Sequence, residues 1–290
     1  MNEEFAPGAM ELPAAYCKAL MFEAGRNEKI VAVDAGAQCS TGTRPFYDAF
    51  PARGINCGKM EAHAAGLCAG MSAAGLVPFF HIDGAAAVGR AFEPILYACD
   101  GANVKIVGGG GLEDVGMLRA ASGVTIIEPA DAAMLPAAVK HMAKTPGVFY
   151  LRLRKSEAPR VYNENARFFI GKANELAEGH DVGVVACGRM VHEALLARDI
   201  LAEHGIMAAV LDMHTIKPLD EEAVVRTAQA CGAVVTAEHH SAMNGLGSAV
   251  AGTLAEHCPV PMERVGAGMA AGDIASKALV CIKAKKSQRL

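Results

Sequence analysis

The sequence predicts an α/β protein with two domains, each a mostly parallel sheet flanked by helices. The chain has 290 residues, about twice the length of an ordinary domain. Short β-like runs alternate with helical stretches in both halves, as in sheets whose parallel strands are joined by crossover helices. Hydrophobic residues make up 52% of the chain and 31 residues are glycine, which favours close helix–sheet packing over a disordered chain.

The first half contains five expected strands and three expected helices. The helix at 61–74 is built mainly of Ala, Gly, Leu and Cys, and Asp131 is expected to cap the last helix of this half. Four glycines at 108–111 stop the third strand and form a flexible turn near the strand ends, where α/β proteins place ligands. The expected strands are 29–34, 77–82, 104–107, 124–127 and 148–153, and the expected helices are 61–74, 89–99 and 132–143.

The second half restarts the alternation after a charged, irregular stretch. We interpret this stretch, 156–167, as a linker between a first domain at 1–155 and a second at 168–290. A glycine turn at 245–247 precedes the last expected helix. Strands are expected at 181–186, 208–211 and 233–236, and helices at 190–204, 221–230 and 248–257.

Charge and composition exclude several classes of protein. The net charge is −4, with 27 basic and 31 acidic residues, and the only basic block is the terminal stretch 283–289, so no nucleic-acid partner is expected. No apolar run of about 18 residues and no signal pattern occur, so we expect no membrane association. The nine cysteines are scattered singly and no CxxC pair occurs, which indicates reduced thiols and a cytoplasmic location.

Two glycine motifs and one histidine pair are further candidate ligand sites. Gly84–Gly89 lacks the lysine of a nucleotide-binding P-loop, and the run 245–250 lacks the third glycine of a dinucleotide fingerprint. His239 and His240 follow Glu238 like metal ligands, but neighbouring strand residues point to opposite faces, so a solvent or interface role is favoured. We therefore expect no metal site formed by this chain alone.

Glu61 is the acidic residue that stands out. It begins a helix of small apolar residues, and two interpretations remain open. A carboxylate at a helix N-terminus is stabilised by the helix dipole, by roughly 0.3–1 kcal/mol. Alternatively, apolar surroundings would raise the pKa of Glu61 and suit it to share or donate a proton.

A series of motifs in order along residues 12–282 resembles the C-terminal half of a transketolase or a 1-deoxyxylulose-5-phosphate synthase. The stretch Phe50–Arg53 with Asn56–Glu61 is similar to that family's "FPxRxxNxGIxEQ", and the stretch Leu112–Asp131 to its "LEDxxxxR…PAD". Further similar segments are Asp34–Thr41, Tyr150–Arg152, Ile170–Lys172, Glu178–Asp181, Ile216–Asp220 and Glu238–Ser248. The resemblance identifies the first domain as a thiamine diphosphate-binding pyrimidine domain and the second as a transketolase C-terminal domain.

The resemblance also implies a cofactor, a partner and an activity. In such enzymes the acid corresponding to Glu61 bonds N1′ of the aminopyrimidine of thiamine diphosphate, which makes Glu61 the candidate catalytic residue. The diphosphate and its Mg²⁺ are held by an N-terminal half with a Gly-Asp-Gly…Asn motif. This chain has no such motif, so it is implied to be a separate subunit that pairs with an N-terminal transketolase-like subunit and transfers a two-carbon ketol unit between sugar phosphates or related substrates.

The sequence departs from the family at the cofactor. Gly36 stands where an acid is usual, and Asp83 and Ala86 stand where two phenylalanines are usual, one of which stacks on the pyrimidine. Phe80 or Phe92 is a candidate substitute for the lost stacking, which is worth about 0.5–1.5 kcal/mol beyond buried area. The expected cofactor-binding residues are Gly36, Glu61, Phe80, Asp83 and Ala86.

The substrate-contacting "GxTHQ" of the family is replaced by glycines, so the sequence does not identify the substrate. The expected substrate-binding residues are His81, Arg119, Arg154 and Lys155, with Arg152 as a further anion partner; the alternative is that the basic residues are merely solvated. Two function classes remain: an active transketolase-like subunit with an altered pocket, and a non-catalytic homologue that binds or regulates a partner. We also expect a homodimer through the small-residue helix at 61–75.

Overall fold

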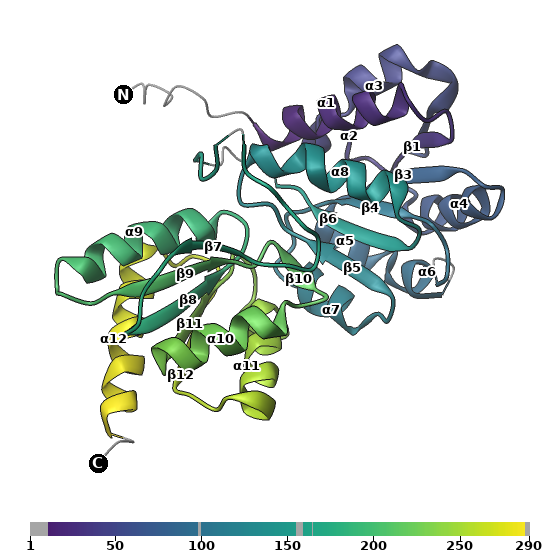
Figure 1. Cartoon of the computed structure of the whole chain (residues 1–290). Helices are drawn as coiled ribbons and strands as arrows, with labels where there is room; N and C mark the ends of the chain where they lie inside the picture. Colours follow the sequence, from purple (N-terminus) through teal and green to yellow (C-terminus); the bar gives the residue numbers. More distant parts are fainter. Residues whose placement is uncertain (1–10, 98–99, 155–158, 164, 288–290) are drawn as a thin grey trace. The chain divides into compact units, whose positions relative to one another are not determined.

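The structure is a computed structural model that describes residues 11–97, 100–154, 159–163 and 165–287 (Figure 1). The chain divides into two compact units, Met1–Phe168 and Phe169–Leu290. Each unit is an α/β structure with a mostly parallel sheet and flanking helices, so the predicted fold class is confirmed. No helix among the described residues combines the length and apolar character needed to cross a membrane.

The first unit is built on a parallel sheet. Its six strands lie in the order β5-β6-β4-β3-β1-β2, and each neighbouring pair is parallel. Four of these strands, β1, β3, β4 and β6, are buried along their whole length, as expected for a sheet covered on both faces. The strands are β1 (Ile30–Asp34), β2 (Gly54–Asn56), β3 (Val77–His81), β4 (Lys105–Gly108), β5 (Val124–Ile127) and β6 (Val148–Arg152).

Helices of very different length connect these strands. The helices α1 and α8 pack side by side (Figure 1), and α4 packs on β3 and on α6. The helices are α1 (Leu12–Ala24), α2 (Gln38–Thr41), α3 (Arg44–Ala49), α4 (Glu61–Ala73), α5 (Gly84–Gly89), α6 (Phe92–Tyr97), α7 (Asp114–Ala120) and α8 (Leu135–Lys144), with 3₁₀ turns at Pro51–Arg53 and Ala132–Met134.

The structure corrects two expectations for these helices. The helix expected at 89–99 is the shorter α6, and residues 98–99 lie outside the described residues. A separate short helix, α5, precedes it and begins after Asp83, whose side chain accepts hydrogen bonds from the Ala85 and Ala86 N–H groups. Residues 12–24 form a helix that the sequence analysis did not predict. Asp131 does act as a cap by accepting from the Ala133 N–H, but the turn it caps is 3₁₀ and the α-helix starts afterwards.

The second unit has a five-stranded sheet in the order β12-β11-β8-β9-β7. All neighbours are parallel except β7, which runs antiparallel to β9 at the edge. The edge strands β7 and β12 were not predicted, because they are short and only partly buried. The elements are β7 (Asn174–Ala177), β8 (Val182–Ala186), β9 (Ala208–Asp212), β10 (Thr215–Lys217), β11 (Val234–Ala237), β12 (Met262–Val265), α9 (Met190–Ala202), α10 (Glu221–Cys231), α11 (Leu246–His257) and α12 (Ala271–Ser287).

Candidate functional site

Glu61 is the first residue of α4 and lies on the buried side of that helix. The buried residues of α4 are Glu61, Ala64, Ala65 and Cys68, whose spacing of three or four residues defines one helix face. The Glu61 side chain is only 5% exposed. A carboxylate that interacted with the helix dipole alone would be free to face water, whereas this one lies on the buried face of the helix.

Arg90 pairs with Glu61. The Arg90 Nη2 atom lies 2.9 Å from Glu61 Oε1, and the arginine side chain is 63% exposed. Arg90 follows α5 directly, and its N–H donates to the Ala86 carbonyl at 2.9 Å. The guanidinium therefore reaches from the surface onto a buried carboxylate. Sequence reasoning missed this partner, although a buried acid in an apolar helix already indicates that a cation must come from elsewhere in the chain.

Gly36 lies at the carboxyl end of β1, close to the point where α/β sheets bind ligands. It is exposed, has a φ of +86°, and donates its N–H to Asp34 Oδ1 at 2.8 Å. Burial raises the pKa of Asp34, while the Gly36 and Ala37 N–H groups oppose that shift. The buried Asp34 carboxylate thus holds this turn through hydrogen bonds, and the exposed Gly36 keeps the backbone of the turn accessible.

Asp83 caps the N-terminus of α5, and Ala86 lies within that helix. The Asp83 Oδ1 atom accepts from the N–H groups of Ala85 and Ala86 at 3.0 and 3.3 Å, and Ala86 is buried. Neither position offers an aromatic ring. Phe92, at the start of α6, is half-buried and keeps part of its ring exposed.

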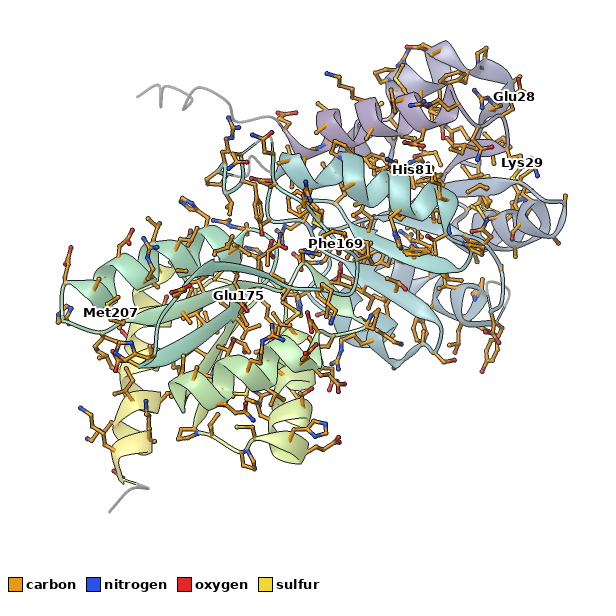
Figure 2. The ribbon with its side chains drawn as sticks, in the orientation of Figure 1. Glu28, Lys29, His81, Phe169, Glu175 and Met207 are labelled. Atoms are coloured by element: carbon orange, nitrogen blue, oxygen red, sulfur yellow. The ribbon has the colours of Figure 1, made fainter. Side chains whose placement is uncertain are left out.

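Phe80 and His81 lie in the core of the first unit. Both are fully buried on β3, and the position of His81 is labelled in Figure 2. The His81 Nε2 atom lies 2.8 Å from the Tyr16 hydroxyl oxygen. Burial lowers the pKa of His81 to about 3, so the ring is neutral at physiological pH. Neither side chain has a surface for a ligand, so we leave Phe80 and His81 out of the proposed site.

Arg152 is a structural residue rather than an anion partner for a substrate. It is fully buried, with Nε 2.8 Å from Asp114 Oδ2 and Nη1 2.7 Å from Glu128 Oε1, and Nη2 donates to the Gly111 carbonyl at 2.7 Å. Burial alone would lower the pKa of Arg152, but the carboxylates of Glu128 and Asp114 raise it above its ordinary value. The expectation that Arg152 contacts an anionic substrate is therefore wrong, because two acids already neutralise it.

The glycines at 108–111 allow two loops to pack closely instead of forming a loose turn. A β-carbon on Gly108 would collide with the Ile82 carbonyl, and one on Gly109 would lie 2.7 Å from the Leu153 carbonyl oxygen. The Gly109 carbonyl accepts from the Gly84 N–H at 3.2 Å. The glycine run is thus packed against the start of α5, the helix that leads to Arg90.

The remaining predicted substrate residues are less defined. Arg119, in the last turn of α7, and Arg154, just after β6, are both half-buried. Lys155 lies outside the described residues. Arg119 and Arg154 stay candidates for contact with an anionic substrate.

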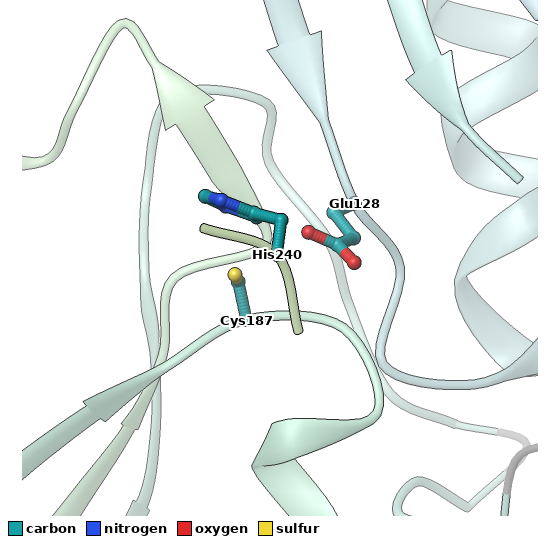
Figure 3. Close-up of side chains that lie close together, drawn as sticks. All are labelled: Glu128, Cys187 and His240. Carbon is teal, nitrogen blue, oxygen red and sulfur yellow. The ribbon is translucent and has the colours of Figure 1, made fainter. Parts of the chain in front are cut away.

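The two neighbouring histidines of the second unit differ in exposure, since His239 is half-buried and His240 is buried. His240 is fully buried, its Nε2 atom lies 2.7 Å from Glu238 Oε2, and its Nδ1 atom lies 2.8 Å from the Ser241 carbonyl oxygen. Glu238 also accepts from the Leu246 N–H at the start of α11. Figure 3 shows His240 with Cys187, which follows β8. His240 is therefore buried, so the solvent role expected for the pair does not hold for this residue.

The comparison with known proteins identifies the family. Residues 171–280 match the family model for the transketolase C-terminal domain. The chain is 42% identical to the 6-deoxy-6-sulfo-D-fructose transketolase subunit SqwH of Clostridium sp. (strain MSTE9), covering 94% of this chain and 90% of that subunit. This protein therefore belongs to the transketolase family, and the predicted resemblance is confirmed.

Within that family the chain is similar to subunits of split enzymes. It is 36% identical to an apulose-4-phosphate transketolase subunit of Phocaeicola vulgatus, covering 85% of this chain and 84% of that one. A solved structure of a split-gene transketolase, an inactive β4 tetramer, superimposes with a TM-score of 0.91 at 38% identity, covering 96% of this chain and 100% of that one.

Single-chain relatives match this protein along about half of their length. The 1-deoxy-D-xylulose-5-phosphate synthase of Thermomicrobium roseum is 34% identical, and the match covers 94% of this chain but 47% of that enzyme. The transketolase of Pichia stipitis shares the fold, with a TM-score of 0.74 at 16% identity over 47% of its chain. This protein is therefore a transketolase-like subunit of the split type.

Proposed function

We propose that this chain is the C-terminal subunit of a two-chain, thiamine diphosphate-dependent transketolase. It would transfer a two-carbon ketol unit between sugar phosphates or related substrates, together with an N-terminal transketolase-like subunit. The observation that carries the proposal is the buried Glu61 carboxylate at the start of α4. It is the acid that the family resemblance singles out.

The residues near Glu61 fit one end of the cofactor. A buried carboxylate with a single charged partner suits a bond to a ring nitrogen, and small residues on α4 leave room beside it. The exposed turn at Gly36 adds accessible backbone at the same edge of the sheet. The aromatic stack of the family has no equivalent at Asp83 or Ala86, and the half-buried Phe92 is the ring that we assign to replace it.

Thiamine diphosphate, when bound, supplies the nucleophilic carbon that accepts the ketol unit. The role of this chain is to hold the proton shared between Glu61 and the pyrimidine N1′, and to fix the carboxylate on the rigid start of α4. Because the Glu61 side chain is shielded from water, a proton held between Glu61 and the ring would be kept away from solvent.

The partner subunit would complete the site. This chain has no Gly-Asp-Gly…Asn motif, so the diphosphate and Mg²⁺ are assigned to the partner. The split-gene relative of known structure is described as inactive when it contains β chains only, which supports the same requirement here. No disulfide joins the eight described cysteines, as suits a cytoplasmic enzyme.

The substrate we propose is an anionic ketose. One relative is named for 6-deoxy-6-sulfo-D-fructose and another for apulose-4-phosphate, and both molecules carry an acidic group. Arg119, Arg154 and Lys155 are the proposed partners of that group.

A non-catalytic, partner-binding homologue is the second candidate. The observation that favours it is the replacement of ring-bearing residues by Asp83 and Ala86, because this removes stacking that helps to hold a pyrimidine. Thiamine diphosphate binding separates the two candidates. A complex with the partner that binds no cofactor and turns over no ketose would support the non-catalytic role.

Glu61→Gln tests the catalytic role in the complex with the partner subunit. The amide keeps the shape but cannot exchange the proton, so we expect kcat/KM for ketol transfer to fall by about 10²–10⁴-fold. Calorimetry should show weaker cofactor binding. Glu93→Gln on α6 is the matched control, because Glu93 is exposed. Unchanged turnover and cofactor binding in Glu61→Gln would refute the assignment.

A further inference from the structure

A cavity lies between the C-terminal ends of α1 and α8 in the first unit. Both helices end at the amino-terminal edge of the sheet, since α1 leads into β1 and α8 leads into β6. The cavity is therefore at the opposite edge of the sheet from the turn that contains Gly36. Its volume is about 370 Å³, which is enough for a small ligand. Its walls include Phe22, Glu23, Arg26, Lys140 and Lys144.

Three basic side chains line this cavity. Arg26, Lys140 and Lys144 are all exposed, and none of them forms an ion pair with a residue that the structure describes. Other basic residues of the chain do have a carboxylate partner, as Lys277 has in Glu263 at 2.7 Å. Cations that line a hollow reinforce one another's field, because the protein around them screens it less than water does. The cavity is therefore suited to attract an anion.

These cations are not required to neutralise the ends of the two helices. Basic residues often lie in the last turn of a helix, because its free carbonyls are partly negative. At the end of α1, however, Arg53 Nη1 already donates to the Ala24 carbonyl at 3.0 Å. Beyond α8, the buried Lys105 Nζ donates to the carbonyls of Thr145 and Gly147 at 2.8 Å each. The three cations of the cavity thus keep their side-chain N–H groups for another partner.

Phe22 supports the arginine of the cavity. The Arg26 guanidinium carbon lies 5.0 Å from the centre of the Phe22 ring, one turn earlier on α1. This contact steadies the guanidinium plane and leaves its N–H edge available for the paired contacts that a phosphate group accepts. Lys140 and Lys144 lie one turn apart on α8, which packs beside α1 (Figure 1). The cavity therefore receives cations from two helices.

The acidic residues near the cavity do not cancel its charge. Glu23 is the acid in the wall, and it is buried and forms no ion pair with any of the three described cations. Glu28 and Lys29, in the stretch after α1, are both exposed and offset each other (Figure 2). The wall of the cavity thus has a surplus of two positive charges.

We propose that this cavity binds a small anion that carries a phosphate or diphosphate group. Arg26 contacts the phosphate oxygens from α1, and Lys140 and Lys144 contact them from α8. The surplus charge of the wall matches a phosphate dianion. An enclosed hollow of this size fits a small molecule better than an acidic protein surface, which would need a broad and flatter contact.

The first experiment titrates the free full-length chain with inorganic pyrophosphate by calorimetry at low ionic strength. We expect saturable binding at one site per chain, and Lys140→Gln/Lys144→Gln should raise the Kd by about 10-fold or more. Lys18→Gln is the matched control, because Lys18 is an exposed lysine of α1 that does not line this cavity. Its Kd should equal that of wild type. Wild type that shows no saturable binding, or equal weakening in Lys18→Gln, would overturn the proposal.

Thermal unfolding with and without pyrophosphate provides a second measurement and a variant on the other helix. The anion should raise the Tm of wild type and of Lys18→Gln, because it binds the folded chain. It should not raise the Tm of Arg26→Gln or of Lys140→Gln/Lys144→Gln. Without the anion the four proteins should unfold at similar temperatures, because the substituted side chains are exposed. Equal stabilisation of all four proteins would place the anion elsewhere and overturn the proposal.

ADP in place of pyrophosphate separates two sources of the diphosphate group. Tighter binding of ADP than of pyrophosphate would assign the cavity to an organic phosphate, and equal or weaker binding would assign it to the free anion. In both cases Lys140→Gln/Lys144→Gln must weaken binding of the preferred probe, and a variant that binds it as wild type does would overturn the proposal. Ketol transfer is not measured in these experiments, so the inference is tested independently of the proposed function.

Discussion

The buried charged side chains of the first unit fall into two groups by the number of partners they have. Arg152 is saturated, because Asp114, Glu128 and a backbone carbonyl surround it. Glu61 has one charged partner, and that partner extends into water. A fully satisfied buried network stabilises a structure, whereas a carboxylate with an open oxygen can accept a further group. Asp114 and Glu128, which neutralise Arg152, are therefore structural acids, whereas Glu61 is the candidate catalytic acid.

Lys105 shows the cost of burying a cation without a carboxylate. It is fully buried at the start of β4, and its Nζ atom donates to the carbonyls of Thr145 and Gly147 at 2.8 Å each. It also lies 4.3 Å from the centre of the Phe149 ring. Burial lowers the pKa of Lys105 to about 7. The amine is therefore partly neutral at physiological pH.

The stability of wild type relative to Lys105→Met should rise between about pH 7 and pH 10. In that range the unfolded chain still holds the proton on Lys105 while the folded chain has released it, so raising the pH favours the folded state. The gain is on the order of a few kcal/mol. Urea unfolding of both proteins across this range measures it. A stability difference that stays flat or falls with pH would contradict the prediction.

Glycine has opposite effects in the helices and in the loops of this unit. In α4, Gly66 and Gly70 are exposed and a β-carbon at either would meet nothing within 4 Å. In the run 108–111, a β-carbon on Gly108 would collide with backbone. The helix glycines are thus dispensable for the fold of the chain, whereas Gly108 is required for the close approach of β4 to the end of β3.

Gly66→Ala should stabilise the free chain by about 0.5–1 kcal/mol, because alanine loses less backbone entropy in a helix. Gly108→Ala should destabilise it by more than that, because a backbone carbonyl must move. Thermal unfolding of the two variants beside wild type measures both effects. A destabilised Gly66→Ala would contradict the prediction.

The subunit has a surface on α4 that the fold itself does not cover. The exposed residues of α4 are small apart from one histidine: Ala62, His63, Gly66, Gly70 and Ala73. Such a surface lets another helix approach closely. The homodimer that we expect from the sequence would use this face.

Light scattering of the free chain tests this association. Wild type and Gly66→Ala should form dimers or larger assemblies, whereas Gly66→Arg should shift the mass toward the monomer because a long charged side chain blocks close helix contact. Circular dichroism checks that the arginine variant stays folded. A monomeric wild type, or an arginine variant that associates as well as wild type, would rule out this face.

Much of the fold was predictable from the sequence. The strand at 124–127 matches β5 residue for residue, and the helices at 61–74 and 221–230 match α4 and α10 within one residue at each end. The ends of these elements are marked in the sequence, by Glu61 at the start of α4 and by Asp220 and Gly232 on either side of α10. Among the missed elements, α5 and α6 are short helices, and β7 and β12 are edge strands with exposed residues. Their stability comes from neighbours rather than from local pattern. The longer helices α1 and α12 were missed as well.

The candidate site divides in the same way. Glu61 could be singled out because an acid in a helix of small apolar residues is visible in the chain itself. Arg90, and the burial of Phe80 and His81, depend on how distant segments meet at the sheet. Residues 61 and 90 belong to separate connections, and only the packing of α6 on α4 brings them within 2.9 Å. Local pattern therefore identified the acid, and tertiary packing selected its partner, because an ion pair depends on distance in space rather than along the chain.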